Sequence, residues 1–191
     1  MKQQVILIAG PTASGKSLAA ARIAAQRGGV VVNADAMQVY RDLSIITARP
    51  GAEELALAPH HLFGHVDGGE RCSVGRWLRD VAPVLKAASA RAQLVVIAGG
   101  TGLYFKALCE GLSEMPEVPA QIVRRWRAAL KEDGPWALHA VLMARDAEVA
   151  DTIEPGDGQR IVRALAIHDA TGKSIRQWQE QAMPPLVPAG S

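Results

Sequence analysis

Apolar residues in the first part of the chain fall into short continuous runs, separated by segments in which apolar residues recur at helical spacing. A short run bounded by turn residues is typical of a strand buried on both faces of a parallel sheet. Three such runs predict strands at 5–9, 30–32 and 94–98. The helical spacing predicts helices at 16–27, 73–90 and 103–110. This alternation indicates an α/β fold with a parallel, doubly wound sheet.

The pattern changes after Gly111, where no further run is typical of a buried strand. Segments 121–131, 136–144 and 159–170 fit helices instead. We therefore predict an α/β core at 1–112 and a helical region at 113–181 that packs partly back on the core. Because residues 182–191 are rich in proline, we expect them to form a flexible, extended tail.

Composition excludes several classes of protein. The chain has 191 residues, of which 49% are hydrophobic and 21% charged, with a net charge of +2, so global disorder is excluded. No apolar run approaches the roughly 20 residues of a membrane helix, and we expect no membrane association. The N-terminal apolar run is too short for a signal peptide, which favours a cytoplasmic protein. Cys72 and Cys109 make neither a disulfide framework nor a zinc site.

A phosphate-binding loop follows the first predicted strand. Its spacing is G-x-x-x-x-G-K-S, and its residues are Gly10, Pro11, Thr12, Ala13, Ser14, Gly15, Lys16 and Ser17. The glycines let backbone N–H groups turn inward around a phosphate, and the following helix presents its positive dipole end. Lys16 adds a mobile charge, and the Ser17 hydroxyl can ligate Mg²⁺. The loop therefore predicts binding of a di- or triphosphate.

The strand at 94–98 ends in Gly99-Gly100-Thr101-Gly102 and carries no acid at that end. Enzymes that hydrolyse nucleoside triphosphates usually place an acid there to hold Mg²⁺ through water. Its absence disfavours simple nucleotide hydrolysis. The segment instead supplies a second glycine turn and one hydroxyl at the carboxyl edge of the sheet, where ligands bind in open α/β sheets.

Asp35 follows the strand at 30–32 and is expected at the same edge as the phosphate loop. A carboxylate in that position can hold Mg²⁺ or act as a general base. It can equally cap a helix, because Asp is a favoured N-cap and Gln38 follows three residues later, as in a capping box. The spacing alone leaves both roles open.

Several other polar residues fit either a functional role or an ordinary structural or surface position. Arg49 can pair with a phosphate or lie on the surface, and His60 and His61 fall in a predicted loop as structural or exposed residues. The segment 121–131 carries a basic cluster suited to tracking RNA phosphates, or simply a solvated face. It consists of Arg124, Arg125, Arg127 and Lys131, with Trp126 either in the core or as a stacking platform. Arg160 and Arg163 near a predicted helix start oppose the helix dipole, which suggests a bound anion such as an RNA phosphate.

These motifs together resemble the tRNA dimethylallyltransferases, also called tRNA isopentenylpyrophosphate transferases. The similar segments are 10–17, 35–41, 47–50, 60–62, 99–105, 159–165 and 171–173, in matching order and spacing. The resemblance covers nearly the whole chain. It implies a P-loop NTPase-like parallel sheet flanked by helices, with a helical insertion that contacts tRNA.

The resemblance implies transfer of a dimethylallyl group from dimethylallyl diphosphate to N6 of adenine 37, beside the anticodon of tRNAs that read UNN codons. Diphosphate is the leaving group, held by the loop at 10–17 with Lys16, Ser17 and Mg²⁺. The family assigns the general base to the aspartate that matches Asp35. The matching threonine, Thr101, lies beside the acceptor and the diphosphate. ATP can also bind at the phosphate loop.

The resemblance also implies contacts with the tRNA anticodon loop. The matching residues are Asp35, Ala36, Met37, Gln38, Thr101, Val123, Gln159, Arg160, Ile161, Val162 and Arg163, although the family commonly has arginine where Val123 stands. Family members continue with a helical stretch that closes the tunnel around the prenyl donor. Because the reactive allylic centre must be shielded from water, we expect this chain alone to bind diphosphate but to turn over weakly.

Three alternatives remain at this point. A P-loop small-molecule kinase also uses a phosphate loop and an acidic base, but it leaves the segment 99–104 unexplained. An adenylate prenyltransferase would use the same loop with a free nucleotide as the acceptor. A non-catalytic RNA-binding remnant would bind tRNA without transferring a prenyl group.

Overall fold

The computed structural model describes residues 4–113, 115–180 and 184–187, and these residues form two compact units. The first unit contains the described residues up to Leu112 together with 184–187. The second unit begins at Ser113 and contains the described residues up to 180. Each has its own hydrophobic core.

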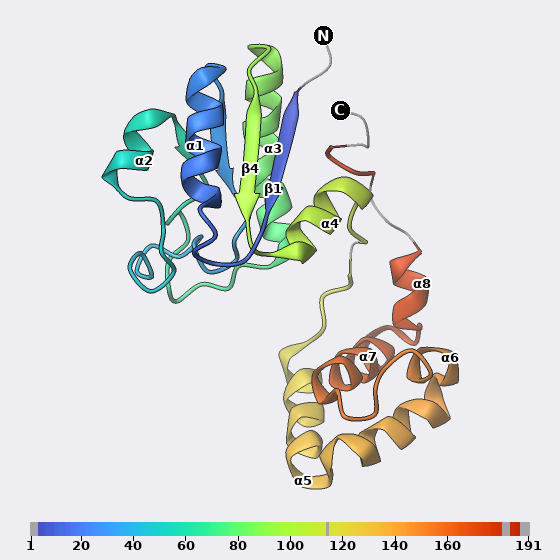
Figure 1. Cartoon of the computed structure of the whole chain (residues 1–191). Coiled ribbons are helices and arrows are strands. Elements are labelled where there is room, and N and C mark those ends of the chain that lie inside the picture. The colour runs from blue at the N-terminus through green and yellow to red at the C-terminus, as the bar shows by residue number, and fades with distance from the viewer. Residues whose placement is uncertain (1–3, 114, 181–183, 188–191) are drawn as a thin grey trace. The chain divides into compact units, whose positions relative to one another are not determined.

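The first unit is built on a parallel sheet. Its strands are β1 (Val5–Ala9), β2 (Val30–Asn33), β3 (His60–His61) and β4 (Val95–Gly99), in the spatial order β1-β4-β2-β3 (Figure 1). All three neighbouring pairs are parallel, with Val5 opposite Val95 and Val30 opposite the same residue from the other side. The sheet and its flanking helices have the P-loop NTPase-like α/β fold that the sequence predicts.

Two expectations about the strands are wrong. The first predicted strand is not buried on both faces, because β1 lies at the edge of the described sheet and Leu7 is 39% exposed. Only the inner strands β2 and β4 are buried along their whole length. His60 and His61, expected in a loop, form the short strand β3 beside β2, where both residues are half-buried. Two residues are too few to produce a strand signal in the sequence.

Four helices accompany the sheet: α1 (Lys16–Gln26), α2 (Ala52–Leu57), α3 (Val74–Ala90) and α4 (Gly102–Glu110). Successive residues of the inner strands belong to two different hydrophobic clusters, one on each face of the sheet. Val32 and Ile97 pack with α3 and α4, whereas Val31 and Val96 pack with the alanine face of α1. The sheet is therefore the middle of three layers, as expected for strands connected by helices.

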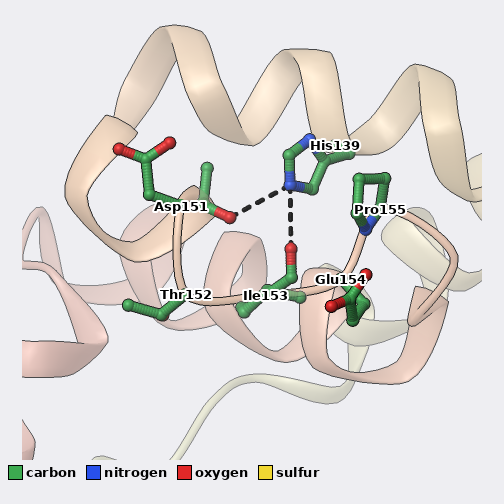
Figure 2. Close-up of a pocket in the computed structure, with 7 residues that line it drawn as sticks. His139, Asp151, Thr152, Ile153, Glu154 and Pro155 are labelled. Carbon is green, nitrogen blue, oxygen red and sulfur yellow. Dashed lines mark hydrogen bonds between the residues drawn. The ribbon is translucent and has the colours of Figure 1, made fainter.

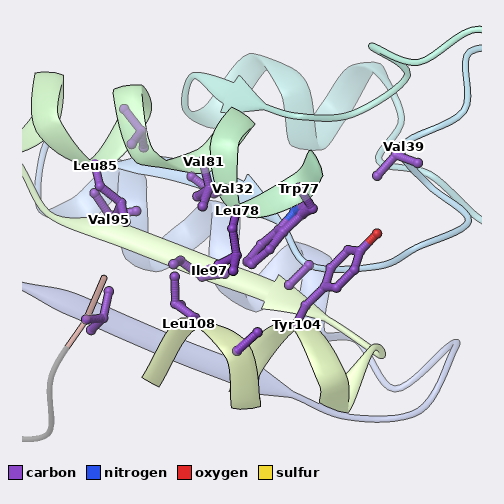
Figure 3. Close-up of a cluster of buried hydrophobic side chains, with 14 of the residues drawn as sticks. Val32, Val39, Trp77, Leu78, Val81, Leu85, Val95, Ile97, Tyr104 and Leu108 are labelled. Carbon is purple, nitrogen blue, oxygen red and sulfur yellow. The ribbon is translucent and has the colours of Figure 1, made fainter. Parts of the chain in front are cut away.

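Trp77 of α3 is the largest fully buried side chain of the first unit. Its ring stacks on Tyr104 of α4 with 4.4 Å between centroids, and Figure 3 shows the two rings face to face. Its indole N–H donates to the Asn33 carbonyl oxygen at 2.8 Å, so the polar atom of this buried ring is satisfied. The contact ties the helical layer to the end of β2.

One residue of the expected flexible tail packs into the core of the first unit. Val187 is buried in the first unit, and its N–H donates to the Leu108 carbonyl oxygen at 3.1 Å. Residues 182, 183 and 188–191 of the predicted tail lie outside the described residues.

The second unit is helical, with α5 (Ala120–Arg145), α6 (Ala147–Ala150), α7 (Gly158–Thr171) and α8 (Ile175–Gln179). The helix α5 is interrupted at Gly134, where φ is 80° and ψ is 170°, directly before Pro135. The predicted helices at 121–131 and 136–144 are its two arms, so the sequence pattern is confirmed there. The arms of α5 and the helix α7 share one core, which includes Trp126, Leu142 and Leu165. No helix within the described part of either unit is long and apolar enough to span a membrane.

Replacing Gly99 by alanine is expected to destabilise the first unit strongly. A Cβ on Gly99 would lie 2.1 Å from the Ala34 carbonyl oxygen, so the backbones of β4 and of the segment after β2 would have to separate. We expect the free energy of unfolding in urea to fall by about 3 kcal/mol or more. Gly102→Ala is the control, because nothing lies within 4 Å of its Cβ position. Equal stability of the two variants would contradict this packing.

Stability is also expected to fall in mildly acidic solution because of His61. Burial lowers the pKa of His61 below its ordinary value of 6.5, and the neighbouring His60 lowers it further. As the pH falls through about 6.5, the unfolded chain therefore takes up a proton before the folded chain does, which favours unfolding. Urea titrations should show a smaller loss of stability between about pH 7.5 and pH 5.5 in His61→Asn than in the unaltered chain. An identical loss of stability in both proteins would show that protonation of His61 is not coupled to unfolding.

Candidate functional site

The phosphate loop connects β1 to α1 at the carboxyl edge of the sheet. Its backbone is left-handed at Ala13, with φ of 62°, and at Gly15, with φ of 79°. Alternation of right- and left-handed residues turns successive N–H groups toward one side, which makes an anion-binding concavity. The loop is joined to β4, because the Gly10 N–H donates to the Gly99 carbonyl oxygen at 3.3 Å.

A cavity of about 170 Å³ lies against this loop. It is lined by residues 12–18 and, from outside the loop, by Gln38, Ala48 and Glu54. The Lys16 ammonium donates to the Pro11 carbonyl oxygen at 2.8 Å, so it rests on the loop itself and must turn away to meet a bound anion. The Glu54 carboxylate is a wall residue that the sequence analysis did not identify, because the six-residue helix α2 gave no clear periodic pattern.

Asp35 caps a turn and does not begin a helix. One carboxylate oxygen, Oδ1, accepts the Met37 N–H at 2.9 Å, and the residues that follow form a turn. The Asn33 side chain fixes the backbone on both sides: its Oδ1 accepts the Asp35 N–H at 2.9 Å, and its amide donates to the Asp35 carbonyl at 3.0 Å. The expected helix cap is therefore an Asx turn, and it engages only one of the two carboxylate oxygens.

The second oxygen of Asp35 faces the end of β4 and the phosphate loop. A Cβ on Gly100 would lie 3.3 Å from Asp35 Oδ2 and 3.4 Å from the Gly10 carbonyl oxygen. Because Gly100 has no side chain, only this residue separates the Asp35 carboxylate from the phosphate loop. The structure brings together three segments that the sequence analysis singled out separately.

Thr101 holds the Asp35 turn in place. Its N–H donates to the Ala34 carbonyl oxygen at 3.1 Å, and its Oγ1 accepts the Ala36 N–H at 2.8 Å. The hydroxyl oxygen makes no capping bond to α4, although Thr101 is the N-cap residue of that helix. The hydroxyl hydrogen remains free to donate to a further acceptor.

Of the next residues in the turn, Gln38 is buried and Met37 is exposed. The Gln38 amide donates to the carbonyl oxygens of Thr47 and Ala48 at 2.9 and 3.3 Å, which fixes the carboxamide in the cavity wall.

Arg49 does not point to a phosphate site in this structure. Its guanidinium donates to the carbonyl oxygens of Tyr40 and Arg41, both at 3.3 Å. The guanidinium also occupies the space beside Gly64 that a Cβ would need. In this structure Arg49 holds the loop after β2 together, a role that the sequence analysis did not predict.

The predicted tRNA contacts at 159–163 lie on the first turns of α7, in the second unit. Gln159, Arg160 and Arg163 are exposed. The side chains of Ile161 and Val162 are buried in the core of that unit, and the contact of these two residues with RNA stays a prediction. Val123 also packs against this core and is only partly accessible.

An acidic residue already balances the start of α7. Asp157 is its N-cap: the carboxylate accepts the Arg160 N–H at 3.1 Å and lies 3.3 Å from the Arg160 guanidinium. Asp157 therefore already offsets part of the positive charge at this helix start, and an RNA phosphate beside Arg160 stays a prediction. The missed signal is the Asp two residues before Gln159, at the favoured capping position.

Trp126 is a core residue and not an exposed stacking platform. Its indole N–H donates to Asp169 at 2.7 Å, and the guanidinium groups of Arg125 and Arg145 lie 5.2 and 5.1 Å from its ring centre. Both arginines also pair with Asp169. The remaining cations of the predicted basic cluster, Arg124, Arg127 and Lys131, are exposed.

A second cavity, of about 260 Å³, lies beside His139 in the second unit (Figure 2). The His139 Nε2 atom is 3.0 Å from the Ala150 carbonyl oxygen and 3.1 Å from that of Ile153. Since both partners are acceptors, Nε2 carries a hydrogen. The ring therefore fastens the chain after α6 to α5, which is a structural role.

Two family models match the sequence. One, described as IPP transferase, matches residues 38–189, and another, described as isopentenyl transferase, matches residues 3–60. The chain belongs to the IPP transferase family. The two matches overlap at residues 38–60, and all residues that line the cavity at the phosphate loop fall within the match at 3–60.

Relatives within the family are named tRNA dimethylallyltransferase. The chain is 53% identical to one from Chelativorans sp. (strain BNC1) over 98% of this chain and 64% of the relative. It is 52% identical to one from Nitrobacter hamburgensis over 96% of this chain and 58% of the relative. The chain therefore spans less than two thirds of the length of either relative.

Solved structures agree with this assignment. A eukaryotic dimethylallyltransferase acting on tRNA superposes with a TM-score of 0.77 at 28% identity, covering 97% of this chain and 47% of that one. A tRNA isopentenylpyrophosphate transferase from Bacillus halodurans gives a TM-score of 0.57 at 34% identity, covering 90% of this chain and 57% of that one.

Substitution at Thr101 tests how the Asp35 turn is held. Thr101→Val keeps the shape of the side chain but leaves the Ala36 N–H without its acceptor, so we expect a loss of about 1–3 kcal/mol in unfolding free energy. Thr101→Ser retains the acceptor and should lose less. Amide hydrogen exchange at Ala36 should be faster in the valine variant alone. Equal exchange in both variants would mean that Thr101 does not hold this turn.

Proposed function

We propose that this chain transfers a dimethylallyl group from dimethylallyl diphosphate to N6 of adenine 37 in tRNAs that read UNN codons. The observation that carries the proposal is the pairing of a phosphate loop with one unengaged carboxylate oxygen of Asp35 across Gly100. The proposed reaction needs the phosphate loop to hold the leaving diphosphate. It also needs the Asp35 carboxylate nearby to take the proton from the acceptor. The names of the relatives support the same reaction.

The leaving diphosphate is held by the loop amides of residues 12–17, with Lys16 turning from the Pro11 carbonyl to the anion. Charge grows on this group as the bond between its oxygen and the allylic carbon breaks, so fixed N–H donors favour the transition state over the ground state. The Ser17 hydroxyl lines the same cavity and suits Mg²⁺, a hard cation that takes most of its ligands from water and phosphate oxygens. When bound, Mg²⁺ would neutralise charge on the diphosphate.

Asp35 is the general base of the proposed reaction. As N6 of adenine bonds to the allylic carbon, its proton passes to the unengaged carboxylate oxygen, and the diphosphate leaves with the electrons of the broken C–O bond. The contact of the other oxygen with the Met37 N–H fixes the orientation of the carboxylate. Thr101, Ala36, Met37 and Gln38 surround this position and are the proposed contacts of the acceptor base.

In the second unit, Gln159, Arg160 and Arg163 are the proposed contacts to the anticodon loop, since they are the exposed members of the segment 159–163. Arg124, Arg127 and Lys131 add exposed positive charge that suits RNA phosphates.

ATP has the same phosphate chemistry as the donor and is proposed to compete at the loop. Because tRNA is the acceptor, we place the protein in the cytoplasm.

A transfer assay with Asp35→Asn tests the proposal. Asparagine keeps the oxygen that accepts the Met37 N–H but cannot take a proton, so the turn should persist while transfer falls about 100-fold or more. The assay measures radiolabel moving from dimethylallyl diphosphate to unmodified tRNA under single-turnover conditions with excess protein and Mg²⁺. Lys16→Ala should instead weaken binding of the donor.

Equal transfer by Asp35→Asn and the unaltered chain would remove Asp35 as the base. Failure of the unaltered chain to bind dimethylallyl diphosphate, together with phosphoryl transfer from ATP, would contradict the proposed function and favour a kinase.

A further inference from the structure

The loop between β2 and α2 has an apolar tip. Ile45 and Ile46 are 94% and 82% exposed, more than any other large apolar side chain in the described chain. Single exposed apolar residues are common on protein surfaces. Ile45 and Ile46 leave nearly their whole surface in water, so they contribute almost nothing to the core. Two adjacent side chains of this kind are typical of a surface that a partner covers.

The backbone beneath this tip is firmly held. The Ala48 N–H donates to the Ile45 carbonyl oxygen at 3.0 Å, and the Arg49 N–H donates to that of Ser44 at 3.1 Å. The Gln38 amide holds the carbonyl oxygens of Thr47 and Ala48 from the other side. The loop therefore presents its two isoleucines from a fixed base, and a partner that covers them need not order the loop first.

The base of the loop belongs to the site already described. Ala48 and Gln38 both line the cavity against the phosphate loop, and Gln38 directly follows Met37, whose N–H binds Asp35. The apolar tip is thus two residues from a wall of that cavity. The Gln38 amide links the two, because it binds the carbonyl oxygens of Thr47 and Ala48, the residues that directly follow Ile46.

We propose that Ile45 and Ile46 contact the nucleobases that flank the acceptor adenine in the anticodon loop. This inference rests on the proposed function. When the acceptor adenine enters the site, it leaves the base stack of the anticodon loop. The two flanking bases then lose the ring on which they stacked. Apolar side chains cover such faces by lying between base steps. The two isoleucines are apolar and exposed, and Gln38, which follows the Asp35 turn, holds the backbone next to them.

The double variant Ile45→Ser/Ile46→Ser tests this contact. Because both side chains are exposed, the variant should fold and melt like the unaltered chain. We expect its Kd for unmodified tRNA to rise about tenfold, the loss of roughly one buried aliphatic side chain. A tRNA with 2-aminopurine beside the acceptor should show a smaller fluorescence change on binding the variant. The Kd for dimethylallyl diphosphate should not change.

Leu57→Ser is the matched control, since Leu57 is also an exposed apolar residue of the first unit, at 42%. If the double variant and Leu57→Ser bind tRNA equally well, the inference is overturned while the proposed function stands. If the unaltered chain binds dimethylallyl diphosphate but no tRNA, both fail. If sedimentation shows that the unaltered chain self-associates and the double variant does not, the occupant is a second copy of the chain, which also overturns the inference.

Discussion

The site depends on the close approach of two backbones at the end of β4. Gly99 lies so near the Ala34 carbonyl that no Cβ fits between them, and the following Gly100 leaves space between Asp35 and Gly10. Hydrogen bonds on either side keep the approach: Ala34 to Ala98 at 2.8 Å, and Thr101 to Ala34 at 3.1 Å. Two glycines in succession therefore do more than form a turn, because they set the distance between the carboxylate and the phosphate loop.

The core of the first unit supports this edge of the sheet from beneath. Trp77 donates its indole hydrogen to the carbonyl of Asn33, and the Asn33 side chain in turn fixes the turn that carries Asp35. Tyr104 stacks on Trp77 from the first turn of α4, which begins just after Thr101. Burial raises the pKa of the Tyr104 hydroxyl, and its contact with Cys72 raises it further, so this ring remains neutral beside the site. Packing and polar contacts thus converge on the same residues.

The sequence predicted those parts whose signals are local. The phosphate loop, β2, β4 and the two arms of α5 all come from short runs, fixed motifs or regular spacing. It could not predict that β1 is an edge strand, because an apolar run does not say how many neighbours a strand has. It also could not show that Asp35 caps a turn and not the expected helix, since the Thr101 hydroxyl that holds the turn lies 65 residues away. The burial of Val162 and the pairing of Arg160 with Asp157 depend likewise on tertiary contacts and on capping, which periodicity alone does not reveal.

One edge of the sheet presents the phosphate loop and the Asp35 carboxylate together. A crystal structure of the chain with inorganic pyrophosphate and Mg²⁺ tests this arrangement most directly. We expect the diphosphate among the amides of residues 12–17, Lys16 turned away from Pro11, and Asp35 Oδ2 still facing Gly100 without a protein partner. A diphosphate bound elsewhere, or a displaced turn at Asp35 with its free oxygen engaged by the protein, would contradict the account.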